Sequence, residues 1–246
     1  MVIYILWLRQ LKRYFRSKSR IIGSIGQPVL FLLALGFGFG PIYSKAGGGD
    51  YMQFLAPGVI AMGILFTAMF AGIEIIWDRQ FGFLKETLVA PVSRFEIMLG
   101  RTLGGATTAL LQGIIVFVIT LFVGFHPNFA FLPVAFFFMV FIALLFTALG
   151  TGIASLLNDM QAFPLIMNFL IMPTFFLSGA LFPLKGLPVG ITAVTRFNPL
   201  TYGVDGLRHA LTGLAQYSFT MDAVVLVFVT ALFVWICSYL FSKIEV

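Results

Sequence analysis

The sequence predicts an all-α integral membrane protein with six transmembrane helices. Of its 246 residues, 60% are apolar and only 10% are charged, and the mean hydropathy is +1.04. A soluble domain carries about 25% charged residues. Roughly 20 consecutive apolar residues suffice for a helix to cross a bilayer, and the apolar runs are continuous, unlike the alternating pattern of a β-barrel. The expected spans are residues 21–40, 54–77, 97–125, 131–157, 163–182 and 223–241 of a single transmembrane domain, 1–246.

The segment before the first span, residues 1–20, has the pattern of an amphipathic helix lying on the membrane surface. One side of the helical wheel is basic, with Arg9, Lys12, Arg13, Arg16 and Arg20. The opposite side is aromatic and aliphatic, with Ile3, Trp7, Leu11, Tyr14 and Phe15. This division favours an interfacial helix. The alternative is a basic tail that only sets the orientation of the chain.

The distribution of basic residues predicts that both termini are cytoplasmic. With the N-terminus inside, eleven basic residues fall in inner segments, and the four in outer segments are Lys45, Lys185, Arg196 and Arg208. Lys and Arg are enriched on the cytoplasmic side of membrane proteins. Orientation and anionic lipid therefore explain the net charge of +6 without a nucleic-acid partner.

The longest inner loop, residues 78–96, reads as a short amphipathic helix, a break and a new helix. Pro91 cannot continue a helix interior. Ser93 and Glu96 have the spacing of a capping box for the next span. Two interpretations stay open for the short helix: it docks in a groove on a partner through its apolar side chains, or it rests on the bilayer surface.

The region 183–220, between the last two expected spans, is neither fully apolar nor loop-like. Phe182-Pro183, Leu187-Pro188 and Asn198-Pro199 interrupt any continuous helix. The interpretations are a hairpin that re-enters the membrane or an ordinary external loop with amphipathic helices.

The sequence contains few residues that could perform chemistry. It has no HExxH motif and no GxxxxGK[ST] phosphate loop, and His126 and His209 lack partners at metal-ligand spacing. Cys237 is expected to be a small buried apolar residue. Glu74 is an intramembrane carboxylate near the interface, interpreted as structural. We therefore expect a non-enzymatic chain whose energy comes from another chain.

Two stretches resemble the ABC-2 type transporter permeases, the membrane subunits of many bacterial and archaeal ABC exporters. The first is DRQFGFLKETLVAPVSRFEIMLGR, whose matching positions are Asp78-Arg79, Gly82, Leu84, Leu88, Pro91-Val92-Ser93 and Gly100-Arg101. The second precedes the last span, with Asn198-Pro199-Leu200-Thr201-Tyr202, Asp205 and Arg208. The overall pattern looks most like the daunorubicin or multidrug resistance permeases.

The resemblance implies a partner and a mechanism. Two copies of a separate ATPase subunit would bind ATP and Mg²⁺, this chain would bind no cofactor, and a second permease copy would complete a homodimer or a heterodimer. The loop 78–96 would receive the push of the ATPase, with coupling residues Arg79, Gly82, Phe83, Leu84, Lys85, Glu86 and Leu88. Phe83 and Leu84 would be the apolar contacts with that partner. Asn198, Pro199, Tyr202, Asp205 and Arg208 would belong to the re-entrant region.

The translocation pathway is sought among the polar residues of the spans, which are Gln53, Thr67, Gln112, Thr147 and Asn168. Thirty Phe residues and few intramembrane charges favour a hydrophobic or amphipathic substrate, drug-like or lipid-like, exported across the cell membrane of a bacterium or archaeon. The alternative substrate is a polysaccharide or glycolipid. The alternative functions are a stand-alone secondary transporter, for which only Glu74 is available, and a membrane-embedded enzyme.

Overall fold

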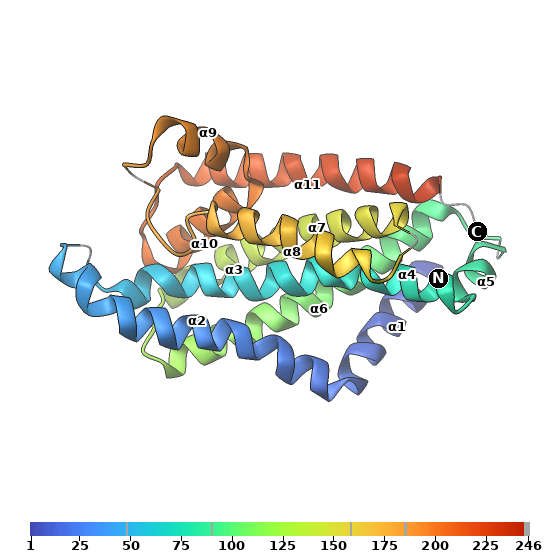
Figure 1. Ribbon diagram of the computed structural model, residues 1–246, viewed down its shortest axis with the longest axis horizontal. Helices are drawn as coiled ribbons and strands as arrows, with labels where there is room; N and C mark the ends of the chain where they lie inside the picture. Colours follow the sequence, from blue (N-terminus) through green and yellow to red (C-terminus); the bar gives the residue numbers. More distant parts are fainter. Residues whose placement is uncertain (48, 90, 158, 185, 244–246) are drawn as a thin grey trace.

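The computed structural model describes residues 1–47, 49–89, 91–157, 159–184 and 186–243, and this part of the chain is built of helices and loops without a strand. Five helical segments in it are long and apolar enough to cross a membrane. They lie side by side along the long axis of the molecule (Figure 1). In chain order they are α2 (Lys18–Lys45), α3 (Tyr51–Ala71) with α4 (Ile73–Gln80), α6 (Arg94–Phe122), α7 (Leu132–Leu156) after the 3-10 turn η1 (Phe129–Phe131), and α11 (Phe219–Ser242).

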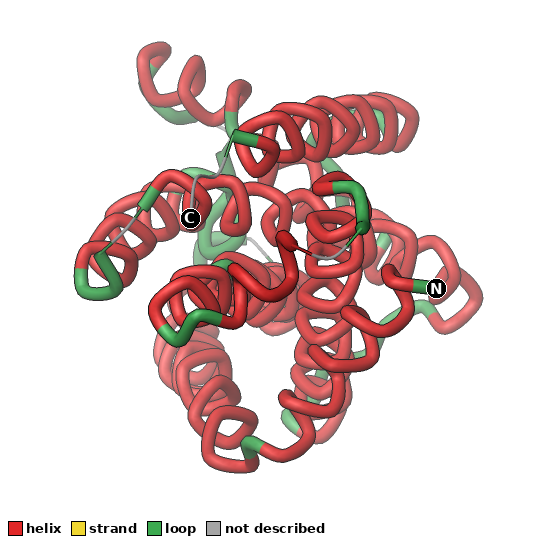
Figure 2. Tube along the Cα trace, turned by 90° about the vertical axis from the view of Figure 1, so that its right-hand side faces the viewer, coloured by secondary structure: helices red, strands yellow, loops and turns green. Residues whose placement is uncertain are grey.

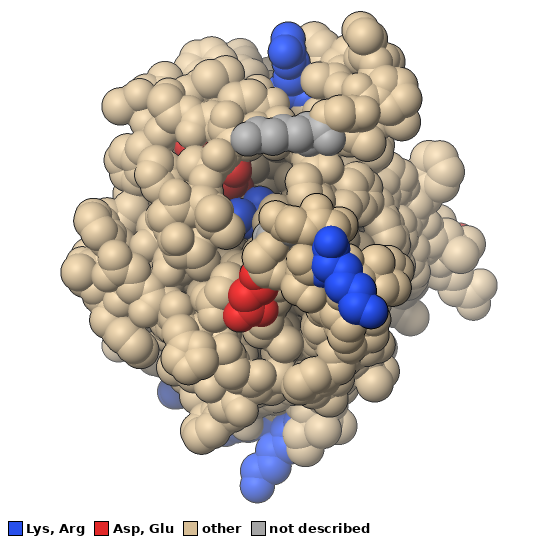
Figure 3. Space-filling model, turned by 90° about the vertical axis from the view of Figure 1, so that its left-hand side faces the viewer, with Lys and Arg blue, Asp and Glu red and all other residues tan. Residues whose placement is uncertain are grey.

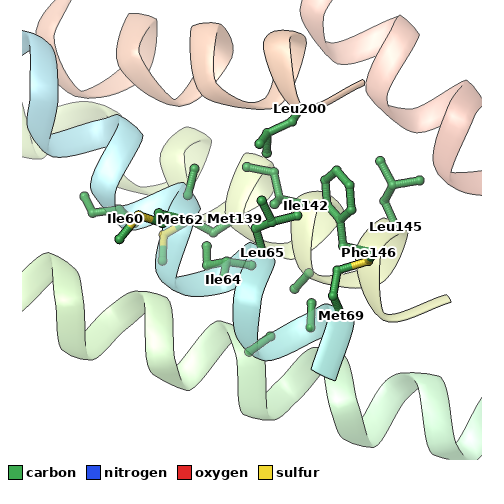
Figure 4. Packing of buried hydrophobic residues seen from close by; sticks show 14 of the residues in the cluster. Ile60, Met62, Ile64, Leu65, Met69, Met139, Ile142, Leu145, Phe146 and Leu200 are labelled. Carbon is green, nitrogen blue, oxygen red and sulfur yellow. The ribbon is translucent and has the colours of Figure 1, made fainter. Parts of the chain in front are cut away.

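Helix α3 is the centre of the bundle because it is apolar on all sides, and such a helix is expected to be buried. Most of its residues are inaccessible to solvent in the isolated chain. Figure 4 shows Ile64, Leu65 and Met69 of α3 beside Ile142 and Phe146 of α7, with Leu200 on the far side. Helices α3 and α7, together with the start of α10 (Pro199–Thr212), to which Leu200 belongs, form the middle of the hydrophobic core.

The helices α3 and α4 cross α7 at glycine pairs that allow backbone contact. A Cβ atom at Gly72 would lie 2.2 Å from the carbonyl oxygen of Gly150, and one at Gly150 would lie 2.4 Å from the carbonyl oxygen of Met69. Only glycine fits at so close a helix crossing. The predicted span 54–77 is therefore two helices that meet at Gly72.

The fifth predicted span, residues 163–182, is shorter than expected. Helix α8 (Ala162–Phe176) has 15 residues, and its helical hydrogen bonding ends where Leu177 N–H donates to Pro173 O at 2.9 Å. Ser178 then bonds back to Phe175 O, and Gly179 takes a positive φ of 75°. The prediction of a helix through residue 182 is therefore wrong. The carbonyl groups of this turn are bound by side chains from other parts of the chain, which stabilises the turn in place of further helix.

Two short helices follow at the end of the bundle away from the termini: α9 (Val189–Phe197) and α10 (Pro199–Thr212) (Figure 1). Helix α10 is buried nearly along its whole length between α7, α3 and α11. Gly203 and Gly206 let it approach α7, where Cβ atoms would strike Ile142 and Phe138.

The N-terminal helix α1 (Val2–Arg16) packs on α6 and buries Leu6, Gln10 and Tyr14. A Cβ atom at Gly104 of α6 would lie 2.6 Å from Gln10, so this helix surface is shaped for α1. The helix ends at Arg16, and α2 leaves at an angle after Ser17 (Figure 1). The predicted helix 1–20 is therefore shorter, and its Tyr14 faces protein instead of the exterior. Figure 2 shows α1 beside the bundle, viewed from the end where the N-terminus lies.

Candidate partner-docking element and charged cluster

The inner loop forms a compact helical turn. Gly82 has φ +79°, a left-handed conformation that glycine adopts at little cost, and it separates α4 from α5 (Phe83–Val89). The helix ends before Pro91, as the sequence predicts. The capping box is confirmed: Glu96 N–H donates to Ser93 Oγ and Ser93 N–H donates to Glu96 Oε2, both at 3.2 Å.

Two apolar side chains of this element are exposed, and neither is among the coupling residues that the resemblance implies. Phe81 is 81% exposed and Val89 is 85% exposed, with Glu86 also on the surface. Leu84, predicted as an outward contact, is fully buried in the hydrophobic core, so this assignment is corrected. Phe83 is half-buried, with the Arg9 guanidinium 3.8 Å from its ring centroid. The side chains of Lys85 and Leu88 lie outside the part of the chain that the structure describes.

Arg79 faces the interior of its own chain. Its guanidinium donates to Leu157 O at 3.0 Å and to Ser155 O at 3.1 Å, at the C-terminal end of α7. A cation there satisfies carbonyls that lack a partner in the last helical turn. Arg79 thus fixes α4 to α7.

A charged cluster lies beside this element. Glu74 and Asp78, one turn apart on α4, face arginines from three other helices. Asp78 accepts from Arg9 at 2.9 and 3.0 Å and from Arg101 at 2.7 Å. Glu74 accepts from Arg20 at 3.0 Å. Arg13 approaches both carboxylates, at 3.7 and 3.9 Å. Part of the basic side of the predicted interfacial helix thus pairs with carboxylates of the same chain.

Sequence reasoning missed this cluster, although one signal was available. Two acidic residues at i and i+4 share one face of a helix. At the edge of a membrane span such a pair requires cationic partners. Arg20 is still part of the cluster although it belongs to α2, because the bend at Ser17 brings it to Glu74.

The second predicted motif holds the far end of the bundle together. Asn198 caps α10, since its Oδ1 accepts from Leu200 N–H, and its amide donates to Thr174 O at 2.6 Å. Pro199 occupies the first turn of α10, where its missing N–H costs nothing. Tyr202 donates to Arg196 O, and Asp205 accepts from the N–H groups of Gln216 and Tyr217 at 2.8–3.0 Å.

Arg208, in the same motif, is buried and bonds backbone carbonyls from two other segments. It donates to Phe54 O at 3.1 Å and to Gly179 O at 2.9 Å, with its guanidinium 3.9 Å from the Phe54 ring centroid. These contacts explain why the chain can turn after α8.

The five polar residues predicted to line a pathway do not converge. Gln112 is buried and accepts from Tyr14 and Ser24, and Thr147 is buried against Gly105. With its amide oxygen turned toward the His126 N–H, the Gln53 side chain pairs with the backbone N–H and carbonyl of His126, at 3.1 and 3.2 Å. Asn168 is exposed on α8. Thr67 lines a cavity of about 640 Å³ beside α2, whereas Gln53 lines a different cavity near His126.

Sequence reasoning also missed Asp222, one residue before the predicted start of the last span. Helix α11 starts at Phe219 with Ser218 as its cap, so Asp222 lies within the first turn. It is fully buried, and neither carboxylate oxygen has a hydrogen-bond partner among the described residues. A Ser cap followed by an acidic first turn is a helix-start signal that could have placed it there.

The two ends of the bundle differ in charge. The far end, seen face-on in Figure 3, is mostly uncharged. The end with α1, α4 and α5 holds the charged cluster described above.

Comparison with known families decides the assignment. The model of the ABC-2 type transporter family matches residues 1–212, which include α1, the α4–α5 turn and the motif at Asn198. The chain belongs to the ABC-2 type transporter family. This membership makes it a membrane transport permease, as the resemblance of its two motifs had indicated.

Named relatives of this ABC-2 permease cover most of its length. Nodulation protein J of Rhizobium leguminosarum bv. viciae is 30% identical over 217 residues, 84% of this chain and 82% of that protein. Inner membrane transport permease YadH of Escherichia coli K12 is 28% identical, covering 97% of this chain and 93% of that protein. Putative transport permease ycf38 of Cyanophora paradoxa is 29% identical, covering 84% of this chain and 72% of that protein.

Proposed function

We propose that this chain is the transmembrane subunit of an ATP-driven ABC exporter of hydrophobic or amphipathic molecules, including drugs, in a bacterial inner membrane. A separate ATPase subunit, present in two copies, would bind ATP and Mg²⁺. The observation that carries the proposal is the α4–α5 element in a chain of this family. It presents Phe81 and Val89 to the exterior at one end of the bundle.

The coupling residues in this proposal are revised from those expected. Phe81, Glu86 and Val89 would contact the ATPase, with Lys85 and Leu88 on the same short helix. Apolar side chains surrounded by charge are typical of a helix that docks in a groove. Arg79, Gly82, Phe83 and Leu84 would act within the chain, by holding α5 against α4 and α7.

The proposed topology places both termini and α5 in the cytoplasm. The excess of basic residues in α1 and the inner loops supports this orientation by the positive-inside rule. Helices α9 and α10 would then lie at the outer surface, with α10 entering the outer leaflet. Burial of α10 against protein supports this re-entrant arrangement, since irregular backbone is tolerated at membrane depth only where protein or water covers it. The membrane is crossed a sixth time by α8 with the following turn.

A second permease copy is proposed to cover α8. This helix exposes a face of Leu165, Ile166, Phe169 and Met172, and Asn168 lies in the middle of it. An amide facing lipid lacks hydrogen-bond partners. A homodimer would bring two such faces together.

The test is co-expression with ABC ATPases and purification in nanodiscs, followed by measurement of subunit stoichiometry. We expect a complex of two permeases and two ATPases that is lost in Phe81→Asp. Leu84→Asp is unsuitable, because it would unfold the chain. The matched control is Phe197→Asp, which alters a 90% exposed Phe on α9 at the other end. A parent chain that purifies alone and transports in ATP-free proteoliposomes would refute the proposal.

A further inference from the structure

Two cavities meet at the bend between α1 and α2. The first, which we call the basic groove, has a volume of about 1040 Å³ and is lined by Arg9, Lys12, Arg13, Arg16 and Lys18. The second, which we call the aromatic pocket, has a volume of about 640 Å³, and its aromatic lining residues are Tyr14, Phe66, Phe70 and Trp77. Ser17 and Ser19 line both. The two cavities are therefore adjacent at this bend.

The basic groove has an excess of positive charge after internal pairing. Asp78 is its acidic lining residue, and that carboxylate already accepts from Arg9 and Arg101. Three cations remain, Lys12, Arg16 and Lys18. In the part of the chain that the structure describes, no carboxylate lies within 4 Å of them. The groove can thus accept an anion without displacing an ion pair.

The aromatic pocket has the composition of a site for an apolar body. Pro28, Phe66, Phe70 and Ile73 provide apolar contacts. Ser24, Gln27 and Thr67 supply a few polar groups, as is usual in sites for small molecules. Arg20 also lines the pocket, and its guanidinium donates to Glu74.

We infer that these two cavities form one binding site for an anionic amphiphile, with its phosphate or other anionic group in the basic groove and its apolar part in the aromatic pocket. A free phosphate would leave the pocket empty, and a folded protein could not enter it between α2 and α3. Only one part of this inference rests on the proposed function: the bound amphiphile would be the molecule that the exporter transports.

A glycine pair on α2 provides a sharp test of the pocket. Gly23 lines it, and a Cβ atom there would meet nothing within 4 Å. Gly23→Phe therefore introduces a large side chain at the pocket wall without a clash at its Cβ atom. Gly26, one turn later, is equally unobstructed and does not line the pocket, so Gly26→Phe is the matched control.

Binding is measured with the full chain in phosphatidylcholine nanodiscs, without an ATPase. Dibrominated phosphatidic acid or, at the same mole fraction, dibrominated phosphatidylcholine serves as the probe, and Trp77 fluorescence is the readout. Trp77→Phe gives the background to subtract. We expect phosphatidic acid to quench several-fold more strongly, and Gly23→Phe, but not Gly26→Phe, to abolish the difference.

The groove is tested with Lys12→Gln/Arg16→Gln. Each basic residue near an anionic lipid contributes roughly fivefold to binding, so losing both should weaken it by roughly twenty-five-fold. The control Lys45→Gln/Arg196→Gln removes the same charge at the far end and should leave binding unchanged.

Several outcomes would overturn the inference. Equal quenching by the two probes, or quenching unaffected by Gly23→Phe, would show that no such site exists. Relief by inorganic phosphate would make the groove a site for free anions. Loss of ATPase assembly in Lys12→Gln/Arg16→Gln with lipid quenching intact would make it a protein-docking surface.

A second measurement tests the cargo. In a complex with the ATPase, phosphatidic acid should stimulate ATP hydrolysis in Gly26→Phe and not in Gly23→Phe. Equal stimulation in both would refute the assignment of this site to cargo. Failure of the complex to form would refute the proposed function while leaving the quenching result intact.

Discussion

Arg101 of α6 and Asp78 of α4 form a buried ion pair, with 2.7 Å between Nη2 and Oδ2 and both side chains at most 6% exposed. The other two guanidinium nitrogens of Arg101, Nε and Nη1, have no hydrogen-bond partner among the described residues. Asp78 is therefore the group that compensates the charge of Arg101 inside the protein.

Asp78→Ala should destabilise the chain by about 3–5 kcal/mol, because it leaves a buried cation uncompensated. Replacing both residues, as Asp78→Ala/Arg101→Leu, should recover much of that loss. The melting temperatures of both variants are measured by thermal unfolding in detergent, with Asp159→Ala, at an exposed position, as the control. An intact melting temperature in the single variant would contradict this account of the cluster.

Arg208→Met should lower the free energy of unfolding by about 3 kcal/mol, since the carbonyls of Phe54 and Gly179 lose a charged donor. Arg208→Lys should not restore stability, because an ammonium cannot reproduce the planar fork of the guanidinium. Arg196→Met, at an exposed position, should change stability by less than about 0.5 kcal/mol. Equal effects of the substitutions at 208 and 196 would rule out the bracing role.

Gly150→Ala should cost about 1–3 kcal/mol, because the added methyl group would strike the carbonyl oxygen of Met69. Gly26→Ala, where space is open, should be neutral or stabilise the helix by up to about 1 kcal/mol. Unfolding measured on the two variants in the same detergent compares them directly. A stable Gly150→Ala protein would mean that α3 and α7 can separate at low cost.

Asp222→Asn should raise stability by about 1 kcal/mol or more, because a fully buried carboxylate without a partner is costly. The same substitution at Asp205 should lower stability by about 1–3 kcal/mol, since its oxygens accept from Gln216 and Tyr217. The prediction is that the two substitutions change the free energy of unfolding in opposite directions, and unfolding measurements on both variants test it. A destabilised Asp222→Asn would indicate a partner for that carboxylate.

Local patterns in the sequence predicted the features that depend on neighbouring residues. Continuous apolar runs located the long helices, and the spacing of Ser93 and Glu96 located the start of α6. The basic face of α1 was also visible, because helical periodicity is a local property.

The features that depend on distant residues could not be predicted. Leu84 looked like a surface contact, because a periodic pattern does not say which apolar side chain of a short helix faces the core. Arg79 looked like a docking residue because nothing near it in the sequence could bind its guanidinium. Its acceptors are 76 and 78 positions away. Helix α8 was expected to continue to residue 182, because its end depends on Tyr51 and Arg208 binding the carbonyls of the following turn.

The position of Arg79 has a mechanical consequence. Helix α5 follows α4 through a single turn, and Arg79 ties α4 to the last carbonyls of α7. Farther along the bundle, the backbone at Gly72, where α4 begins, is in direct contact with the backbone of α7 at Gly150. Because of these two contacts we expect α4 and α7 to move together, so a force applied at α5 would reach the centre of the bundle, where α7 packs against α3.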